Sequence, residues 1–188
     1  MGRRRQVSDR QISQAAREVF LDRGPKAPVA MVAKKLGVST ATLFQRAGTK
    51  QQLMLMALQP EVADMTGLNR GVQPREPVRE QLAHVLGEIN EYLGAVIMGS
   101  LTLRAAHIAA ALPEPTPYRL RTRLAQWLSS AAEQGLLAVQ DDDATAEVLI
   151  GALEARHIHA HMRGERLSAK QHWEFIQSMI GVVFPARP

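Results

Sequence analysis

The chain has 188 residues, a net charge of +5 and no cysteine. Without cysteine there are no disulfides, thiolate metal sites or cysteine nucleophiles, and no apolar stretch approaches the length of about 18 residues that a membrane span needs. The basic start MGRRRQVSDR is not followed by an apolar stretch, so we expect no signal peptide, no membrane attachment and a cytoplasmic protein.

The charge is distributed unevenly along the chain. Residues 1–50 contain eleven Lys or Arg and three acidic residues, a net charge of +8, which leaves −3 for the rest. A basic head of this kind is typical of a segment that binds a polyanion. We expect residues 51–188, which have a net negative charge, to have a function other than binding a polyanion.

Almost the whole chain has the composition and apolar spacing of helices. Capping patterns mark several helix starts, because Ser8 is followed by Gln11 and Thr49 by Gln52 at the spacing of a capping box. The expected helices cover about residues 9–23, 28–36, 40–47, 50–65, 76–98, 100–112, 117–134, 142–163 and 169–184.

Glycines and prolines between residues 66 and 77 predict a break in the chain. We therefore expect a DNA-binding domain of residues 1–50, joined by a helix at about 50–66 to a second domain of residues 67–188.

The turn Gly37-Val38-Ser39 separates two short expected helices, which is the pattern of a helix-turn-helix. Gly37 can adopt the positive φ of the turn, and Ser39 can cap the next helix. The helix at 40–47 is far shorter than the ~12–15 residues at which an isolated helix becomes marginal, so its neighbours must hold it. A short helix held in this way suits insertion into the major groove of DNA.

The stretch VAMVAKKLGVSTATLFQRAGTKQQLM, residues 29–54, resembles the DNA-binding signature of the TetR family of bacterial transcriptional repressors. The matching positions are Val29, Val32-Ala33, Gly37-Val38-Ser39, Thr42-Leu43-Phe44, Lys50 and Leu53. The resemblance implies an all-α protein of about nine helices, with a three-helix head and a larger body that binds a ligand and dimerises. It also implies a protein that is not an enzyme and needs no cofactor.

The resemblance further implies which residues contact DNA. They are Thr40, Ala41, Gln45 and Arg46 at base edges, Thr42 and Lys50 at phosphates, Phe44 by packing or sugar contact, and Arg3, Arg4 and Arg5 along the backbone or in the minor groove. Two positions depart from the family pattern. Phe44 lacks the hydroxyl of the customary Tyr, and Ala47 replaces a customary Phe, with about 1.5–3 kcal/mol less apolar burial.

Two helices of the body carry apolar stripes wide enough to bury against other helices. The resemblance implies that the last two helices pair with their copies in a homodimer, and the alternative is an ordinary monomer core. The candidate dimer contacts are Leu149, Leu153, His157, His161, Phe175, Ile176, Met179 and Val183.

The central helices are rich in flexible apolar side chains with a few polar ones among them, a set that can line a cavity for a small-molecule effector. The candidates are Met65, Leu86, Ile89, Asn90, Leu93, Met98, Leu103, Arg104, His107 and Trp127.

The expected function is a repressor that binds a palindromic operator as a homodimer and is released by a small-molecule ligand. One alternative is a sequence-tolerant, nucleoid-type DNA-binding protein that uses the head only electrostatically. The other is a small helical metal-dependent enzyme, because His157 and His161 in the stretch HIHAHM share a helix face. No further metal ligand can be named, so we expect no metal there.

Overall fold

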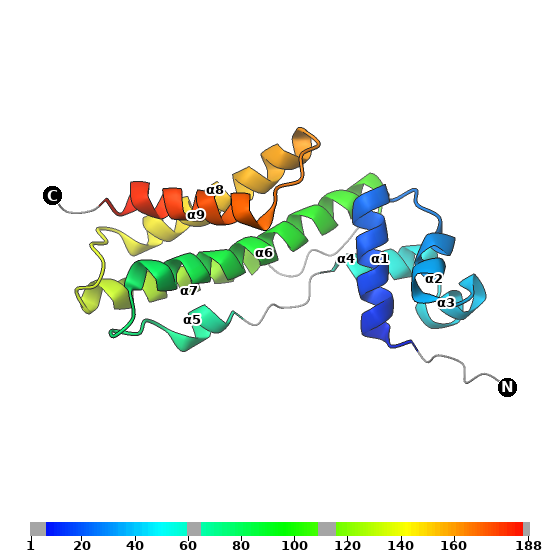
Figure 1. Ribbon diagram of the computed structural model, residues 1–188, viewed down its shortest axis with the longest axis horizontal. Coiled ribbons are helices and arrows are strands. Elements are labelled where there is room, and N and C mark those ends of the chain that lie inside the picture. The colour runs from blue at the N-terminus through cyan, green and yellow to red at the C-terminus, as the bar shows by residue number, and fades with distance from the viewer. Residues whose placement is uncertain (1–6, 60–64, 109–115, 186–188) are drawn as a thin grey trace. The chain divides into compact units, whose positions relative to one another are not determined.

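The computed structural model describes residues 7–59, 65–108 and 116–185, and all the regular secondary structure within them is helical (Figure 1). The predicted all-α fold is confirmed. The basic residues Arg3, Arg4 and Arg5 lie outside the described residues. The helices are α1 (Asp9–Arg23), α2 (Val29–Leu36), α3 (Thr40–Ala47), α4 (Lys50–Leu58), α5 (Thr66–Arg70), α6 (Val78–Ala105), α7 (Thr116–Glu133), α8 (Asp142–Met162) and α9 (Ala169–Val183).

The helices expected at 76–98 and 100–112 are not separate, because α6 runs from Val78 to Ala105 without a break at Gly99. Gly99 serves packing instead: a Cβ atom at this position would lie 2.4 Å from the backbone oxygen of Leu58. The α4 helix ends at Leu58, earlier than the end expected at about residue 65. The short helix α5 lies in the segment between residues 66 and 77 that was predicted as a break.

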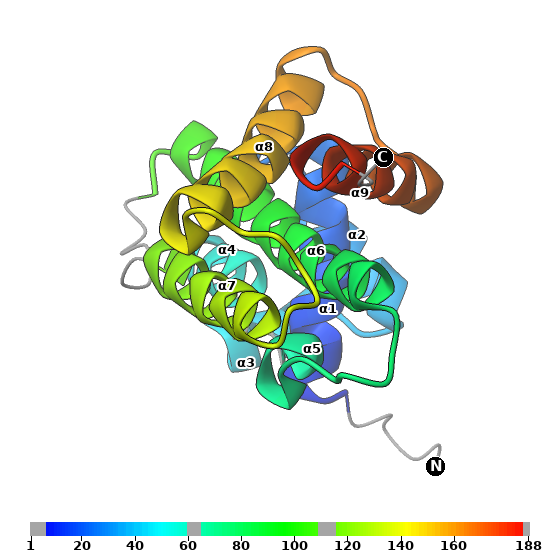
Figure 2. The ribbon, with the colours of Figure 1, turned by 90° about the vertical axis from the view of Figure 1, so that its left-hand side faces the viewer.

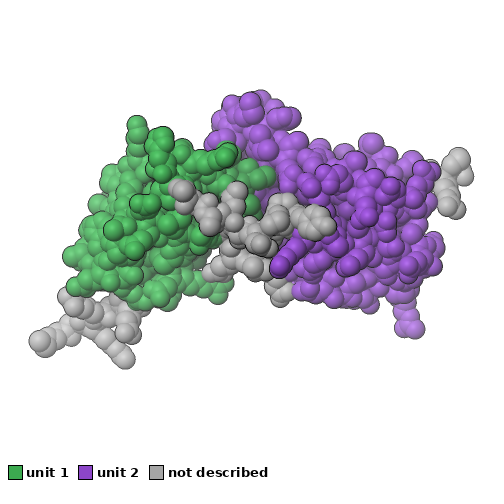
Figure 3. All heavy atoms as spheres, turned by 180° about the vertical axis from the view of Figure 1, so that it is seen from behind, with its two compact units in different colours: residues 1–61, 95–112 green, residues 62–94, 113–188 purple. Residues whose placement is uncertain are grey.

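The chain forms two compact units, coloured separately in Figure 3. Unit 1 consists of residues 1–61 and 95–112, and unit 2 of residues 62–94 and 113–188. The last part of α6 therefore packs with the head residues, which a boundary drawn from composition near residue 66 does not capture.

Unit 1 has a core built from α1 to α4 and the end of α6. Its most buried apolar side chains include Ile12, Ala16, Phe20, Val32, Leu43, Leu53, Leu58, Leu103 and Ile108. Capping boxes begin α1 at Ser8 and α4 at Thr49, as predicted. The α1 helix also holds the end of α4, because Ser13 and Arg17 donate hydrogen bonds to the backbone oxygens of Met56 and Ala57.

Unit 2 has its core among the first part of α6 and the helices α7, α8 and α9. The α7 and α8 helices pack against each other (Figure 2), and the fully buried side chains include Leu82, Leu86, Ile89, Leu124, Leu128, Leu149, Ile150 and Leu153. Arg156 links α8 to α9, since its guanidinium lies 4.4 Å from the Phe175 ring centroid and donates to the backbone oxygen of Gln171. Across the described residues, none of the helices combines the length and apolar character needed to cross a bilayer.

Candidate nucleic-acid interface

The α2 and α3 helices meet in a tight turn that begins at Gly37. Gly37 has φ 70° and ψ 30°, a left-handed conformation that favours glycine. Val38 donates a backbone hydrogen bond to Ala33 at 3.1 Å, and the Ser39 hydroxyl accepts one from the Thr42 amide at 3.0 Å. These contacts satisfy the end of α2 and the start of α3, and they form the expected helix-turn-helix.

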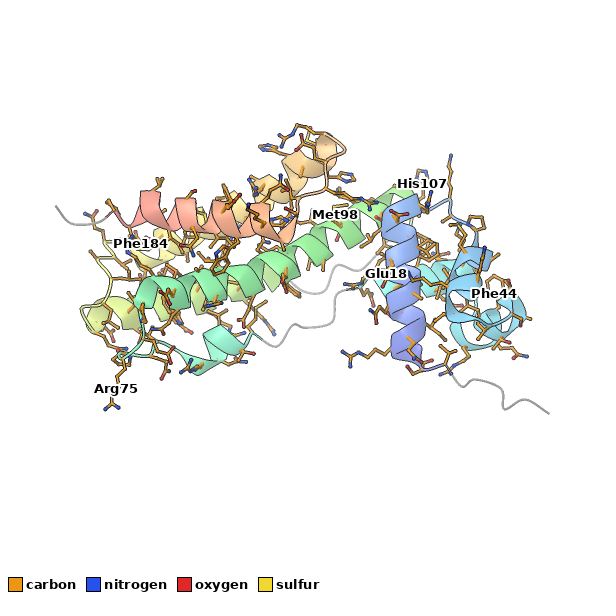
Figure 4. All side chains as sticks on the ribbon, in the orientation of Figure 1. Glu18, Phe44, Arg75, Met98, His107 and Phe184 are labelled. Atoms are coloured by element: carbon orange, nitrogen blue, oxygen red, sulfur yellow. The ribbon has the colours of Figure 1, made fainter. Side chains whose placement is uncertain are left out.

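The α3 helix has one buried side and one exposed side. Leu43 is 1% exposed and Ala47 is buried beside it, so the departure at Ala47 leaves this position inside the core of unit 1. Ala41, Phe44 and Gln45 are exposed (Phe44 is labelled in Figure 4). The helix therefore presents a small methyl, an aromatic ring and an amide to the solvent.

Three other predicted DNA contacts have partial exposure. Thr40 is half-buried at the start of α3. The Thr42 hydroxyl lies 2.8 Å from the Ser39 hydroxyl, where either can donate. Lys50 is the first residue of α4, and its Nζ atom lies 5.9 Å from the ring centroid of the buried Phe20. A half-buried lysine at a helix N-terminus is suited to a phosphate, because the ammonium group and the partial positive charge of the helix end both attract an anion.

Arg46 differs from the expectation that it reaches base edges. Its Nη1 donates to the backbone oxygen of Val7, and its Nη2 pairs with the Asp9 carboxylate at 2.5 Å. A base contact would require this pairing to break. The sequence analysis did not identify Val7 and Asp9 as partners of Arg46. The available signal was Asp9 itself, an acidic residue within a strongly basic segment, which favours an ion pair with one of the arginines.

The predicted ligand residues are divided between the two units. Met65, Leu86, Ile89, Asn90, Leu93 and Trp127 belong to unit 2, whereas Met98, Leu103, Arg104 and His107 belong to unit 1. Leu103 is part of the core of unit 1, and Arg104 and His107 are exposed at and beyond the end of α6.

Within unit 2, two of the predicted ligand residues are buried and polar. Asn90 is 4% exposed and already has a partner, because Nε2 of His157 donates to its backbone oxygen at 3.1 Å and lies 2.9 Å from its Oδ1. Trp127 is also 4% exposed, and its Nε1 has no hydrogen-bond partner. A buried unpaired N–H is costly, so Trp127 marks a place where an acceptor would be favourable.

A cavity of about 690 Å³ lies elsewhere in unit 2. Its lining comes from Arg79, residues 135–140, Thr145 and residues 183–185. Phe184, labelled in Figure 4, forms part of this wall, and its backbone oxygen accepts a hydrogen bond from Arg79. None of the ten predicted ligand residues lines it.

The predicted dimer contacts also need correction. Leu149, Leu153, Ile176 and Met179 are buried inside the chain's own unit 2, with exposed fractions of 0%, 0%, 1% and 8%, so they cannot contact a partner. The large apolar side chains that α8 and α9 do expose include Val148, Ile158, Met162, Trp173 and Val182.

The structure gives His157 and His161 different surroundings. The His157 ring lies 5.0 Å from that of His172, and its burial lowers its pKa below the usual value, as does the nearby Arg156. His161 is exposed. Among the described residues, no group of three or more His, Asp or Glu side chains is placed to hold a metal ion.

Comparisons with known proteins match both parts of the chain. The model for bacterial regulatory proteins of the tetR family matches residues 12–57, and the model for the AefR-like transcriptional repressor C-terminal domain matches residues 93–186, half of the chain. The chain belongs to the TetR family. It is therefore a DNA-binding transcriptional regulator with a C-terminal domain of the ligand-binding type, and not an enzyme.

Solved structures of TetR-family proteins share this fold. The TetR transcriptional regulator SCO0520 from Streptomyces coelicolor is 20% identical, with a TM-score of 0.67 over 96% of this chain and 100% of its own. A TetR-like regulator from Rhodococcus sp. RHA1 is 22% identical, with a TM-score of 0.59 over 94% and 98%. SmeT, the repressor of the Stenotrophomonas maltophilia multidrug efflux pump SmeDEF, is 16% identical, with a TM-score of 0.61 over 95% and 91%. No curated protein matches the chain.

Proposed function

We propose that this TetR-family regulator is a cytoplasmic repressor that binds a palindromic operator as a homodimer and is released by a small-molecule effector. The observation that carries the DNA-binding part is the exposed side of α3 within a head of net charge +8. Ala41 and Gln45 are exposed there without a competing partner among the described residues. Gln45 has the donor and acceptor needed for a bidentate contact with adenine, and Ala41 can contact a thymine methyl.

Phosphate contacts would position this helix. Thr42 and Lys50 lie at the starts of α3 and α4, and Lys50 makes no salt bridge within the described residues. Phe44 adds an exposed ring that can pack on sugar. Contacts of this type fix the register of the protein on DNA, and the base contacts supply the sequence preference.

The proposed homodimer uses the outer sides of α8 and α9. Val148, Ile158, Met162 and Val182 are 58%, 42%, 77% and 80% exposed, which is unusual for large apolar side chains on two neighbouring elements. A two-fold dimer would present two copies of α3 to two half-sites about one helical turn apart.

The proposed effector acts by population shift, since it would bind better to a conformation with misplaced heads. The α6 helix supports this coupling, because residues 78–94 belong to unit 2 and residues 95–105 to unit 1. The unpaired Nε1 of Trp127 supports an effector that carries an acceptor oxygen. A screen for compounds that release bound operator tests this part, with Trp127→Phe as the variant that removes the indole N–H but keeps an aromatic ring. The absence of any releasing compound would count against it.

The DNA-binding part is tested with duplexes selected from random sequence by the wild-type protein. We expect a preference of about 10³-fold or more over a scrambled duplex, retained at near-physiological salt. Gln45→Ala should relax the preference at one base pair, whereas Lys50→Ala should weaken binding uniformly and reduce the salt slope by about 1. Equal binding to selected and scrambled duplexes would favour the alternative of a sequence-tolerant DNA-binding protein.

A further inference from the structure

The cavity of about 690 Å³ in unit 2 has no part in the function proposed above. Its lining comes from segments that are far apart in the sequence: Arg79 near the start of α6, residues 135–140 between α7 and α8, Thr145 of α8, and residues 183–185 at the end of α9. Trp127, on which the effector proposal rests, does not line it. The volume lies within the range of roughly 300–1,000 Å³ that sites for small molecules have.

Most of the cavity lining is apolar. The larger apolar side chains are Leu136, Leu137, Val139, Val183 and Phe184. Leu137 and Phe184 are 9% and 5% exposed, so the structure of unit 2 fixes their positions. The backbone N–H of Phe184 also donates to the oxygen of Ile180 at 2.9 Å, which ends α9 at this wall. An apolar group that enters the cavity therefore meets a surface that is already formed, and its burial is favourable.

Arg79 supplies the charge of the cavity. It is the only charged side chain among the described residues that line it, and none of them is acidic. A guanidinium has five N–H donors, and one of those on Arg79 donates to the backbone oxygen of Phe184. The others have no protein partner within the described residues. A positioned guanidinium with unused donors favours a carboxylate or a similar oxyanion, which accepts two parallel hydrogen bonds.

The acidic stretch at residues 141–143 does not cancel this preference. These aspartates are not part of the cavity lining. The Asp141 carboxylate accepts a hydrogen bond from the Ala144 amide at 2.8 Å, and that of Asp142 accepts one from the Asp143 amide at 3.2 Å. Their charges therefore serve the N-terminus of α8, where carboxylates are favourable.

We propose that this cavity binds a small organic anion with an apolar body. The oxyanion pairs with the guanidinium of Arg79, and the apolar part lies against the walls that come from α9 and from the connection between α7 and α8. This site goes beyond the proposed function, because it uses neither the exposed side of α3 nor Trp127.

The test is a calorimetric titration of the full chain at pH 7 with two carboxylates, octanoate and 3-phenylpropanoate. We expect saturable binding with one site per chain, and a rise of the thermal unfolding midpoint when the ligand is present. Octanol has the same chain length without the charge, and octylammonium has the opposite charge. Both should bind at least about tenfold more weakly than octanoate, because neither can replace the charge-assisted hydrogen bonds to Arg79.

Two variants change the site in different ways. Arg79→Gln keeps a donor for the backbone of Phe184 but removes the charge, and it should weaken octanoate binding by about tenfold or more. Ala138→Glu adds a carboxylate at an exposed position of the lining and should have the same effect by repulsion. Arg75→Gln is the matched control, because Arg75 is an exposed arginine outside the lining (labelled in Figure 4). The unfolding midpoint of each variant without ligand checks its folding.

Three results would overturn the proposal. One is no saturable binding of either carboxylate, and another is equal affinity for octanol and octanoate, which would show that Arg79 contributes nothing. The third is octanoate binding that survives both Arg79→Gln and Ala138→Glu but is lost in Trp127→Phe, which would place the ligand at Trp127. No DNA is used, so failure of the repressor or effector proposal leaves this test unaffected.

Discussion

Gly99 of α6 lies directly against the backbone oxygen of Leu58, at the end of α4, with no room for a side chain between them. The contact joins two segments of unit 1 that are about forty residues apart in the chain. It explains why a glycine stands inside a long helix, where it costs about 0.5–1 kcal/mol relative to alanine.

Gly99→Ala should therefore destabilise the protein. The added Cβ would lie 2.4 Å from a backbone atom, so the helices must separate, and we expect a loss of about 1–3 kcal/mol in the free energy of unfolding. Gly87→Ala is the control in the same helix, because nothing lies within 4 Å of a Cβ atom there. Urea unfolding measures both, and equal stability of the two variants would contradict the close approach.

Arg17 should stabilise the end of α4. Its Nε and Nη2 donate to the backbone oxygens of Ala57 and Gln59 at 2.8 and 3.0 Å, which satisfies carbonyls that α4 leaves unpaired. We expect Arg17→Ala to lower the free energy of unfolding by about 1–3 kcal/mol in a urea titration. Arg23→Ala, which removes only an exposed pair, should change it by less than ~0.5 kcal/mol. A loss no larger for Arg17 than for Arg23 would argue against the capping role.

Acid should weaken unit 2 through His157. Burial lowers the pKa of His157 in the folded state below its usual 6.5, so the unfolded chain takes up the proton first. The stabilisation from the neutral ring is complete above pH 6.5 and is lost as the pH falls below that value towards the folded-state pKa. The pKa of His172 is lowered as well, by burial and then by the charges of His157 and Arg156.

Thermal unfolding between pH 5 and pH 8 would measure this effect. The midpoint of wild type should fall on the acid side, and His157→Gln should flatten that part of the curve. His161→Gln is the matched control, because His161 is exposed on the same helix. An equal acid dependence in wild type and His157→Gln would assign the effect to other groups.

Val182 and Leu149 should behave differently when changed, although both are apolar residues of the last two helices. Val182 is 80% exposed, so Val182→Glu should leave folding intact and disrupt the proposed homodimer, which light scattering detects as a halved mass. Leu149 is fully buried, so Leu149→Ala should cost about 2–5 kcal/mol of stability. Gln177→Glu, at an exposed polar position of α9, controls for the added charge. A monomeric wild type, or a dimer unchanged by Val182→Glu, would contradict the proposed interface.

Local chemistry made much of this protein predictable from its sequence. The caps at Ser8, Ser39 and Thr49 and the turn at Gly37 depend on residues within a few positions of each other, so the sequence was sufficient to place the head helices. The TetR signature lies in the same segment, since a reading helix and its turn need a fixed short spacing.

The tertiary structure decided what depends on partners far along the chain. The sequence indicated two helices, at 76–98 and 100–112, where the structure has one, and only the structure shows that Gly99 gives the backbone of Leu58 room. Arg46 was expected at base edges until the contact with Asp9 showed where its guanidinium lies. An apolar stripe shows that a helix buries one side but not what covers it, so only the packed structure placed Leu149 inside its own unit. Periodicity and charge are properties of single segments, whereas burial and pairing are set by segments that meet only after folding.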